Sequence, residues 1–350
     1  MSDSSTLNSI IKSPTRIVQT PTAPVIVVGL PRSGSSYITH VLSCLEGWFV
    51  FDDLYPYQKS KEFGLSPTMD LSQHPEQLKG FIHSLTWQLR AKIKFEENFQ
   101  VPDLTWDDTF EMEEQLLNAF EPGPLTWMAV LEEWLMRLAL HAGQRRWGYK
   151  TPQDFLNMDE LMTLFPGVKF IYILRDPRKM MRSFKNLPKV KTHGTQDGES
   201  GQYHPLVYAL YWNKAYERVN DFIRRGKAPV ETVKFEDLVK TPEAVADRLA
   251  QFLDTRVVGN VVLEKGNTSF TGGSAKELTN TEVAICEAIA RQSMQAAGYE
   301  LKRPLPSPLD IFDFLGTTFS FTLHQLKRLG DKRARHSIVS FLKSLIGKKS

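Results

Sequence analysis

One short segment, GLPRSGSS at residues 29–36, combines a permanent positive charge with three hydroxyl groups. The charge is on Arg32, and the hydroxyls belong to Ser33, Ser35 and Ser36. Gly29 and Gly34 allow the backbone amides to approach a ligand closely. Arginine, hydroxyls and backbone amides are the groups that bind phosphate and sulfate. The segment therefore predicts an anion site.

The elements on either side of this loop would position it. Val25–Val28 is an uninterrupted β-branched run, which is typical of a strand buried on both faces of a parallel sheet. Apolar residues at helical spacing follow from Ser35, and Ser33, Ser35 and Ser36 can cap that helix. The N-terminus of a helix adds a partial positive charge. A strand, a phosphate-sized loop and a helix are therefore expected to hold the anion.

The loop differs from a Walker A motif, G-x-x-x-x-G-K-[ST], at one important position. Gly29 and Gly34 have the required separation, but Ser35 stands where the lysine belongs. Without that lysine, the loop is poorly equipped for a γ-phosphate beside magnesium, whereas Arg32 supplies a cation earlier in the loop. A serine-rich turn that only caps a helix remains an alternative. A second motif is needed to distinguish such a turn from an anion-binding loop.

The second motif follows another apolar run, Phe170–Leu174, which predicts a strand. Arg175 stands at its end, Asp176 and Pro177 are suited to the N-cap and first turn of a helix, and Ser183 lies eight positions after Arg175. The guanidinium of an arginine in this position can donate two parallel hydrogen bonds to a phosphate monoester. In the alternative Walker B reading Asp176 would hold magnesium, which Pro177 and the missing loop lysine disfavour.

Three further polar residues follow predicted strands. Asp52 and Asp53 come directly after Trp48–Phe51, and Lys150 ends a short run before a Thr-Pro turn. The carboxyl ends of parallel strands line one crevice, so these side chains are expected to meet the anion loop there. A solvated turn for the two carboxylates and a surface position for the lysine remain the alternatives.

Composition limits the class of protein. The chain has 350 residues, of which 41% are hydrophobic, and its net charge of +3 is too mild to indicate nucleic-acid binding. Cys44 and Cys286 offer neither a disulfide framework nor metal-ligand spacing. No apolar run approaches the ~20 residues that span a bilayer. A cytoplasmic protein without a metal is expected.

Local changes in amino-acid composition divide the chain into regions. Residues 1–22 are rich in Ser, Thr and Pro and predict a disordered leader. Residues 23–302 form the main domain, with an inserted helical cap at about 58–143 that would cover the crevice and select the substrate. Residues 303–350 combine a proline-rich linker with a basic amphipathic tail. For 327–350, contact with an anionic membrane surface, packing against the domain and packing against a second subunit all remain open.

Taken together, the two motifs resemble those of sulfotransferases that depend on 3′-phosphoadenosine 5′-phosphosulfate (PAPS). PRSGSS at 31–36 resembles the family's 5′-phosphosulfate loop, and the segment from Arg175 to Ser183 resembles its 3′-phosphate motif. KTP at 150–152 and KFEDL at 234–238 are lesser matches. The resemblance covers about residues 23–301. It implies an α/β fold, a P-loop-type three-layer α/β/α arrangement with a central parallel sheet.

The resemblance also implies a role for each matched residue. Arg32 would contact the transferring sulfuryl group, with Lys150 beside it, and Tyr37 stands where a ring stacks on adenine. The remaining positions would bind the two phosphates of PAPS, namely Ser33, Gly34, Ser35 and Ser36 at the 5′ side and Arg175 and Ser183 at the 3′ side. Many relatives carry a histidine base after the lysine, but Thr151 follows here. The base is therefore assigned to Asp52 or Asp53.

The function implied is in-line transfer of a sulfuryl group from PAPS to a hydroxyl or amine, with release of 3′-phosphoadenosine 5′-phosphate. The acceptor would be a small molecule, a glycan or a lipid-like compound, and a dimer remains open. The alternatives are a P-loop nucleotide kinase-like phosphotransferase, which strict magnesium dependence would indicate, and a non-catalytic nucleotide-binding module recruited to membranes.

Overall fold

The computed structural model describes residues 12–18, 22–95, 101, 103–120, 124–186, 203–261 and 276–328. The chain forms two compact units. The first comprises residues up to 173 together with 225–263, and the second comprises 174–224 and the residues from 264 onward. Most of the predicted tail, residues 329–350, and residues 1–11 of the predicted leader lie outside the described residues.

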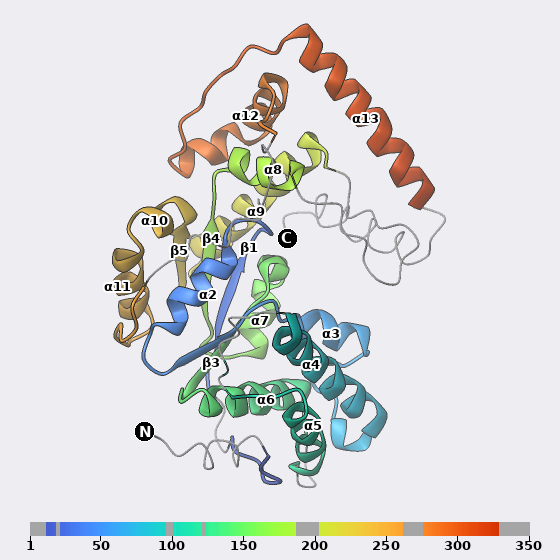
Figure 1. Ribbon diagram of the computed structural model, residues 1–350, viewed down its shortest axis with the longest axis vertical. Helices are drawn as coiled ribbons and strands as arrows, with labels where there is room; N and C mark the ends of the chain where they lie inside the picture. The colour runs from blue at the N-terminus through green and yellow to red at the C-terminus, as the bar shows by residue number, and fades with distance from the viewer. Residues whose placement is uncertain are drawn as a thin grey trace. The chain divides into compact units, whose positions relative to one another are not determined.

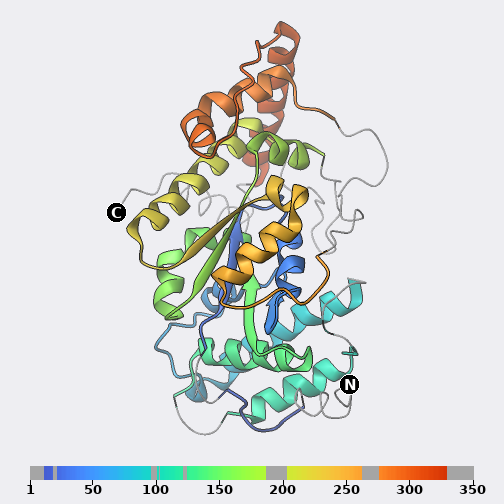
Figure 2. The same ribbon diagram turned by 90° about the vertical axis from the view of Figure 1, so that its left-hand side faces the viewer.

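A five-stranded sheet forms the centre of the first unit, in the order β2-β3-β1-β4-β5 (Figures 1 and 2). The strands are β1 (Val25–Gly29), β2 (Trp48–Phe51), β3 (Arg146–Lys150), β4 (Lys169–Leu174) and β5 (Val230–Lys234). β1 pairs in parallel with both β3 and β4, and β2 pairs in parallel with β3. The predicted α/β fold with a central parallel sheet is confirmed.

β1 occupies the centre of the sheet because every one of its residues is apolar or small. All five are buried, as the β-branched run predicts for a strand covered on both faces. Gly29 at its end has no room for a side chain, since a Cβ there would lie 2.6 Å from Cγ2 of Ile173 on β4. β1 therefore delivers the following loop to the carboxyl edge of the sheet in a fixed position.

Helices cover both faces of the sheet (Figures 1 and 2). On one face α2 (Ser35–Ser43), α10 (Phe235–Lys240) and α11 (Pro242–Phe252) share a continuous apolar core with Val25 and Val27 of β1. On the other face Trp134 of α6 (Trp127–His141) packs against Phe51 of β2, and Trp147 of β3 packs against Phe165 after α7 (Met158–Leu164). The short η2 (Pro152–Leu156) joins β3 to α7.

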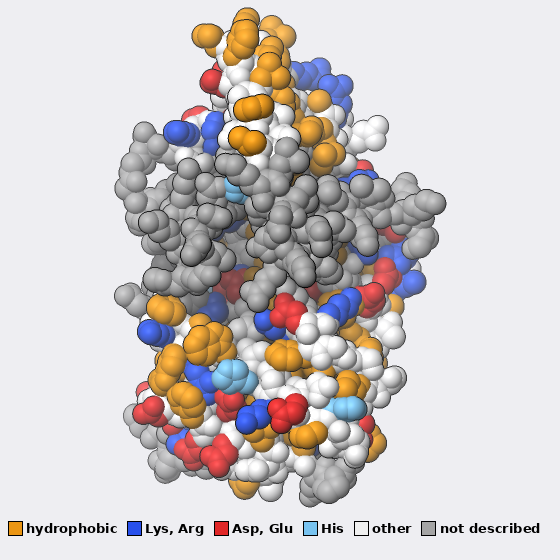
Figure 3. Space-filling model, turned by 90° about the vertical axis from the view of Figure 1, so that its right-hand side faces the viewer, with side chains coloured by type: hydrophobic (Ala, Val, Ile, Leu, Met, Phe, Trp, Pro, Cys, Tyr) orange, Lys and Arg blue, Asp and Glu red, His pale blue; other side chains and the backbone are white. Residues whose placement is uncertain are grey.

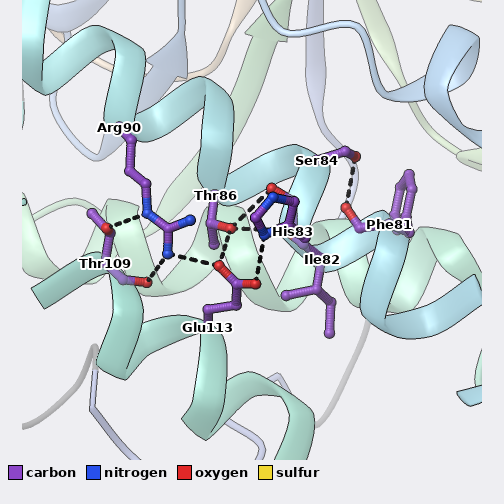
Figure 4. Close-up of polar contacts among 8 residues, drawn as sticks. All are labelled: Phe81, Ile82, His83, Ser84, Thr86, Arg90, Thr109 and Glu113. Carbon is purple, nitrogen blue, oxygen red and sulfur yellow. Dashed lines mark hydrogen bonds and ion pairs between the residues drawn. The ribbon is translucent and has the colours of Figure 1, made fainter. Parts of the chain in front are cut away.

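Between β2 and β3 the chain forms α3 (Pro56–Glu62), η1 (Leu71–Gln73), α4 (Pro75–Phe95), α5 (Asp108–Asn118) and α6. A buried polar cluster joins α4 to α5 (Figure 4). Arg90 donates to Thr109 Oγ1 at 2.8 Å and to Glu113 at 2.7 Å, and Thr86 and His83 also contact the Glu113 carboxylate. Hydrogen bonds to charged groups contribute about 1.5–3 kcal/mol each, so the cluster fixes the two helices together.

The described part of the leader packs on α6. Backbone amides of Ile17 and Val18 donate to the buried Glu133 carboxylate at 2.9 Å, and the Arg137 guanidinium donates to the Ser13 and Thr15 carbonyls. Residues 12–18 therefore contact α6. Glu133 and Arg137 lie far along the chain and become partners of this segment only once α6 has formed. The disordered leader expected for 1–22 stays a prediction.

The second unit is helical, with α8 (Pro177–Lys185), α9 (Pro205–Arg225), α12 (Asn280–Ala296) and α13 (Pro308–Arg328). Arg178 joins α8 to α12, because its guanidinium contacts Asp176 at 2.7 Å and Glu287 at 2.6 Å. Among the helices that the structure describes, none is long and apolar enough to cross a membrane. The boundaries expected for the domain, its cap and its tail stay predictions.

Candidate active site

The loop between β1 and α2 turns back on itself through Ser33. Its amide and its hydroxyl both donate to the Leu30 carbonyl, at 3.1 and 2.6 Å. α2 begins after Gly34, which has a φ of 89° and supplies no side-chain cap. The prediction that the serines cap this helix is therefore wrong, because Ser33 bonds within the loop and Ser36 donates to Asp52 instead. Among the described residues, no side chain caps α2, so its first amides are available to an anion.

Gly34 is held against an aromatic ring, and this contact supports a test of the loop. A Cβ at Gly34 would overlap the Phe235 ring at the start of α10, and its φ of 89° already disfavours any side chain. We expect Gly34→Ala to lower the free energy of unfolding by about 3 kcal/mol or more.

Gly47→Ala is the matched control, since Gly47 has a similar φ of 80° with nothing within 4 Å of the added Cβ. This variant should lower the free energy of unfolding by only about 1–2 kcal/mol, the cost of a side chain at a positive φ. Urea denaturation of both variants measures the difference, and equal costs would contradict the role of the Phe235 contact.

Arg32 and Asp53 share an unusual backbone conformation. Both have a positive φ, 70° for Arg32 and 55° for Asp53, in the left-handed region that non-glycine residues seldom adopt. Each such residue costs about 1–2 kcal/mol, which the surrounding structure must offset. Burial also lowers the pKa of the half-buried Arg32. The loop thus holds a guanidinium in a strained, partly desolvated position.

Lys150 is the centre of the polar contacts at the carboxyl edge of the sheet. Its ammonium is buried and lies 2.6 Å from Asp52 Oδ1, 2.8 Å from Asp53 Oδ1 and 3.3 Å from Ser36 Oγ. Ser36 in turn donates to Asp52 Oδ2 at 3.2 Å. One cation therefore joins the first turn of α2 to both carboxylates after β2, and the predicted meeting of Lys150 with the aspartates is observed.

Backbone pairing explains how Lys150 reaches this position. Val27 on β1 is in register with Lys150, the Leu54 amide donates to the Lys150 carbonyl at 3.1 Å, and the Thr151 hydroxyl donates to the Leu54 carbonyl. The turn after β2 is therefore fastened to the end of β3. The surface position considered for Lys150 does not hold.

Tyr37 lies on α2 beside the same loop. Its ring packs edge-on against Phe235, with the ring centroids 5.7 Å apart. Phe235 belongs to the segment KFEDL, so the contact gives that motif a structural role in supporting the loop. Stacking of Tyr37 on a base stays a prediction.

The second motif belongs to the second unit. Arg175 follows the last residue of β4, and its carbonyl accepts a hydrogen bond from Trp212 Nε1 at 2.9 Å. Asp176 is the N-cap of α8, as expected, and accepts a bond from the Arg178 amide at 2.9 Å. Because the Arg178 guanidinium also binds the Asp176 carboxylate, the Walker B reading has no support. Ser183 is buried on the same helix.

Comparison with known proteins identifies the family. A model described as the sulfotransferase family matches residues 24–258, about two thirds of the chain. This chain belongs to the sulfotransferase family. No protein with a curated description matches it.

This chain is similar to several solved structures of sulfotransferases. The sulfotransferase domain from the curacin biosynthetic pathway is 17% identical and has a TM-score of 0.50, over 81% of this chain and 100% of that one. The corresponding domain of the Synechococcus PCC 7002 olefin synthase is 18% identical, with a TM-score of 0.49 over 81% and 98%. Sulfotransferase STF9 from Mycobacterium avium is 16% identical, with a TM-score of 0.42 over 81% and 79%. At this level of identity, the curacin domain supports a common fold and nothing finer.

An open cleft of about 600 Å³ lies beside Asp53 in this sulfotransferase. Tyr55, Lys92 and Phe95 are among its lining residues, which come from the turn after β2 and from α3 and α4. Burial, the charges of Asp53 and Asp52 and a hydrogen bond to Asp53 raise the pKa of Tyr55 far above its usual value. Sequence reasoning missed Tyr55 and Lys92, although the position of Tyr55 two residues after Asp53 could have indicated it.

Sequence reasoning also missed Asp154, which follows the strand that carries Lys150. Its side chain is buried on η2, four residues after Lys150, and its Oδ2 has no hydrogen-bond partner among the described residues. Burial raises the pKa of this carboxyl from 3.8 to about 7, although hydrogen bonds to Asn157 and Thr151 oppose the shift. Burial raises the pKa of Tyr149 well above its usual value, and the charge of Asp154 adds to that shift.

Asp154 makes the stability of this sulfotransferase depend on pH. The unfolded carboxyl loses its proton near pH 4, whereas the folded one keeps it until about pH 7, so the folded state binds more protons in between. The free energy of unfolding should therefore fall by about 2–4 kcal/mol between those values and stay low above them.

Asp154→Asn carries no ionisable group and should remove this decline. Urea denaturation of both proteins at about pH 5 and about pH 8 gives the change in the free energy of unfolding between these pH values. The part of this change that the parent shows and the variant lacks is the contribution of Asp154. Parallel pH profiles for the variant and the parent would contradict a protonated Asp154.

Proposed function

We propose that the chain transfers a sulfuryl group from PAPS to a hydroxyl or amine acceptor. The observation that carries the proposal is the Lys150 ammonium, which contacts Ser36 in the first turn of α2 and both carboxylates after β2. A cation in this position lies between the loop that would hold the donor and the carboxylate that would deprotonate the acceptor. In-line transfer requires these two groups on opposite sides of the sulfur atom.

The loop after β1 suits the 5′ side of the donor. The first turn of α2 has no side-chain cap, so its amides would bind the 5′-phosphate together with Ser33, Gly34, Ser35 and Ser36. Arg32 would contact the sulfuryl group and the phosphate oxygen that departs. Negative charge grows on that oxygen during transfer, and a fixed guanidinium stabilises it without reorganisation. No metal is required by this scheme.

The second motif would bind the 3′ side of the donor. Arg175, which follows β4, would offer a bidentate fork to a phosphate monoester, and Ser183 would add a hydroxyl from α8. Tyr37 would stack on the adenine. PAPS carries two separated phosphates, and each motif would bind one of them.

Asp53 is the better candidate for the base. Its side chain is 43% exposed and lines the cleft, whereas that of Asp52 is 22% exposed and also receives the Ser36 hydroxyl. The acceptor proton would pass to Asp53 as the acceptor oxygen or nitrogen bonds to sulfur and the bond from sulfur to the phosphate oxygen breaks. Asp52 would hold Lys150 and Ser36 in position. The acceptor would be a small molecule, a glycan or a lipid-like compound, in a cytoplasmic setting.

Calorimetric titration of the metal-free protein with 3′-phosphoadenosine 5′-phosphate tests the donor site. We expect binding without magnesium, lost in Arg175→Ala and kept in Lys179→Ala, which removes an exposed cation from α8, four residues after Arg175. Binding of ATP that requires magnesium, with none of the bisphosphate, would overturn the proposal in favour of a kinase. Bisphosphate binding without transfer to any acceptor would indicate a non-catalytic module.

A further inference from the structure

Helix α13 has two separate apolar faces. One face packs within the second unit, where the rings of Phe314 and Phe321 lie 5.6 and 4.9 Å from the ring of His204. Thr318, between them on the same face, is hydrogen-bonded through Oγ1 to His204 Nε2 at 3.0 Å. These contacts hold the helix through this face, and α13 also contacts α12.

The second face forms a continuous exposed stripe. Its members recur at intervals of three and four residues and are Leu309, Phe312, Leu315, Phe319 and Leu323. Such spacing places them on one side of a helix. Phe312 and Phe319 are the most informative, since 72% and 73% of these large rings are exposed. Figure 3 shows hydrophobic side chains gathered along this helix. We define these five residues as the α13 stripe.

An exposed stripe of this kind indicates a binding surface. Soluble proteins seldom expose contiguous large apolar side chains, and burying one such side chain contributes about 1.5–3 kcal/mol. The helix cannot serve as a membrane span, because none of the described helices is sufficiently long and apolar. A surface-lying helix is compatible with both facts.

The charge that follows the stripe identifies the partner. From Lys327 to the C-terminus the sequence contains eight Lys or Arg residues and one acidic residue, Asp331. Basic residues beside an apolar helix face attract anionic lipid headgroups, at about 1 kcal/mol for each Lys or Arg near the surface. The same charges would repel a second copy of this chain. An anionic bilayer therefore complements the stripe better than a second subunit does.

We propose that the α13 stripe binds the surface of an anionic lipid bilayer, with the helix lying in the interface and the basic residues from Lys327 onward on the headgroups. The apolar side chains enter the acyl region, while the face that carries Phe314, Thr318 and Phe321 stays packed on the protein. This surface extends the lipid contact expected for 327–350 to the folded helix before it. It does not depend on the proposed sulfuryl transfer.

Vesicle flotation of the full chain tests the proposal, using phosphatidylcholine vesicles with and without phosphatidylserine. We expect binding only to the vesicles with phosphatidylserine, weakened by high salt. The double variant Phe312→Ser/Phe319→Ser should bind about tenfold or more weakly. The matched control is Val239→Ser/Val258→Ser, which alters two exposed apolar residues of the first unit and should bind as the parent does.

Two results would overturn this proposal. Unchanged binding by the double Phe variant would assign the lipid contact to the basic tail alone. A dimer in solution that the same double variant dissociates, detected by light scattering without vesicles, would assign the stripe to a second copy. Circular dichroism spectra that match the parent establish that each variant is folded.

Discussion

Arg32→Ala should lower turnover at saturating donor by about 10²–10³-fold, the usual loss when one preorganised donor to a developing charge is removed. The guanidinium is half-buried, so its interaction with the departing phosphate oxygen is weakly screened by water. Because the charge on that oxygen grows only during transfer, the loss should appear mainly in kcat. Steady-state sulfuryl transfer from PAPS measures it.

Two comparisons separate the charge of Arg32 from its backbone. Arg32→Gly also removes the cation, but glycine adopts the positive φ of 70° without strain. It should therefore lose as much turnover as Arg32→Ala, and it should unfold at a higher urea concentration than Arg32→Ala does. Arg175→Ala should instead raise the KM for PAPS with a small change in kcat, since a ground-state contact is removed. Equal losses of kcat in Arg32→Ala and Arg175→Ala would contradict the roles assigned to both residues.

Asp53→Asn should lower turnover by about 10²–10⁴-fold, because it removes the general base. Asparagine tolerates the positive φ of 55° at this position, so the variant should keep its backbone conformation. Donor binding should also persist, as measured by titration with 3′-phosphoadenosine 5′-phosphate.

Asp52→Asn provides the matched comparison for Asp53→Asn. Both substitutions remove one carboxylate from Lys150, which lies 2.6 Å from Asp52 and 2.8 Å from Asp53. Their effects on the lysine should therefore be similar. Asp52→Asn also changes the contacts of Asp52 with the Ser36 hydroxyl and with Lys92, whereas Asp53→Asn removes the proposed base. If Asp52→Asn reduces kcat more than Asp53→Asn does, Asp52 is the base and the assignment made from the cleft is wrong.

The sequence predicted the features of this fold that depend on neighbouring residues. The β-branched run of β1 and the apolar run of β4 are signals that need no tertiary information, and both strands formed where expected. The meeting of Lys150 with Asp52 and Asp53 was predictable for a related reason, since carboxyl ends of parallel strands share one edge. The rule that parallel strands end at one edge of a sheet therefore predicted this part of the site.

Other features depend on partners that are distant along the chain. Nothing near Ser36 indicates that its hydroxyl binds Asp52 rather than capping α2, and nothing near Ile17 indicates Glu133. The cleft beside Asp53 requires α3 and α4 to be packed, which no local pattern specifies. The roles of Arg175 and Ser183 in donor binding stay predictions from the resemblance.

The strand order has a consequence for synthesis of the chain. β1 lies between β3 and β4, yet it is translated first, and the first of its neighbours begins only at Arg146. Translation proceeds at about 5–20 residues per second, so roughly ten seconds pass between the synthesis of β1 and that of its first neighbouring strand. During that interval an apolar strand, destined for the centre of the sheet, is open to other nascent chains. The yield of folded protein therefore depends on how chaperones protect this segment, which equilibrium unfolding does not measure.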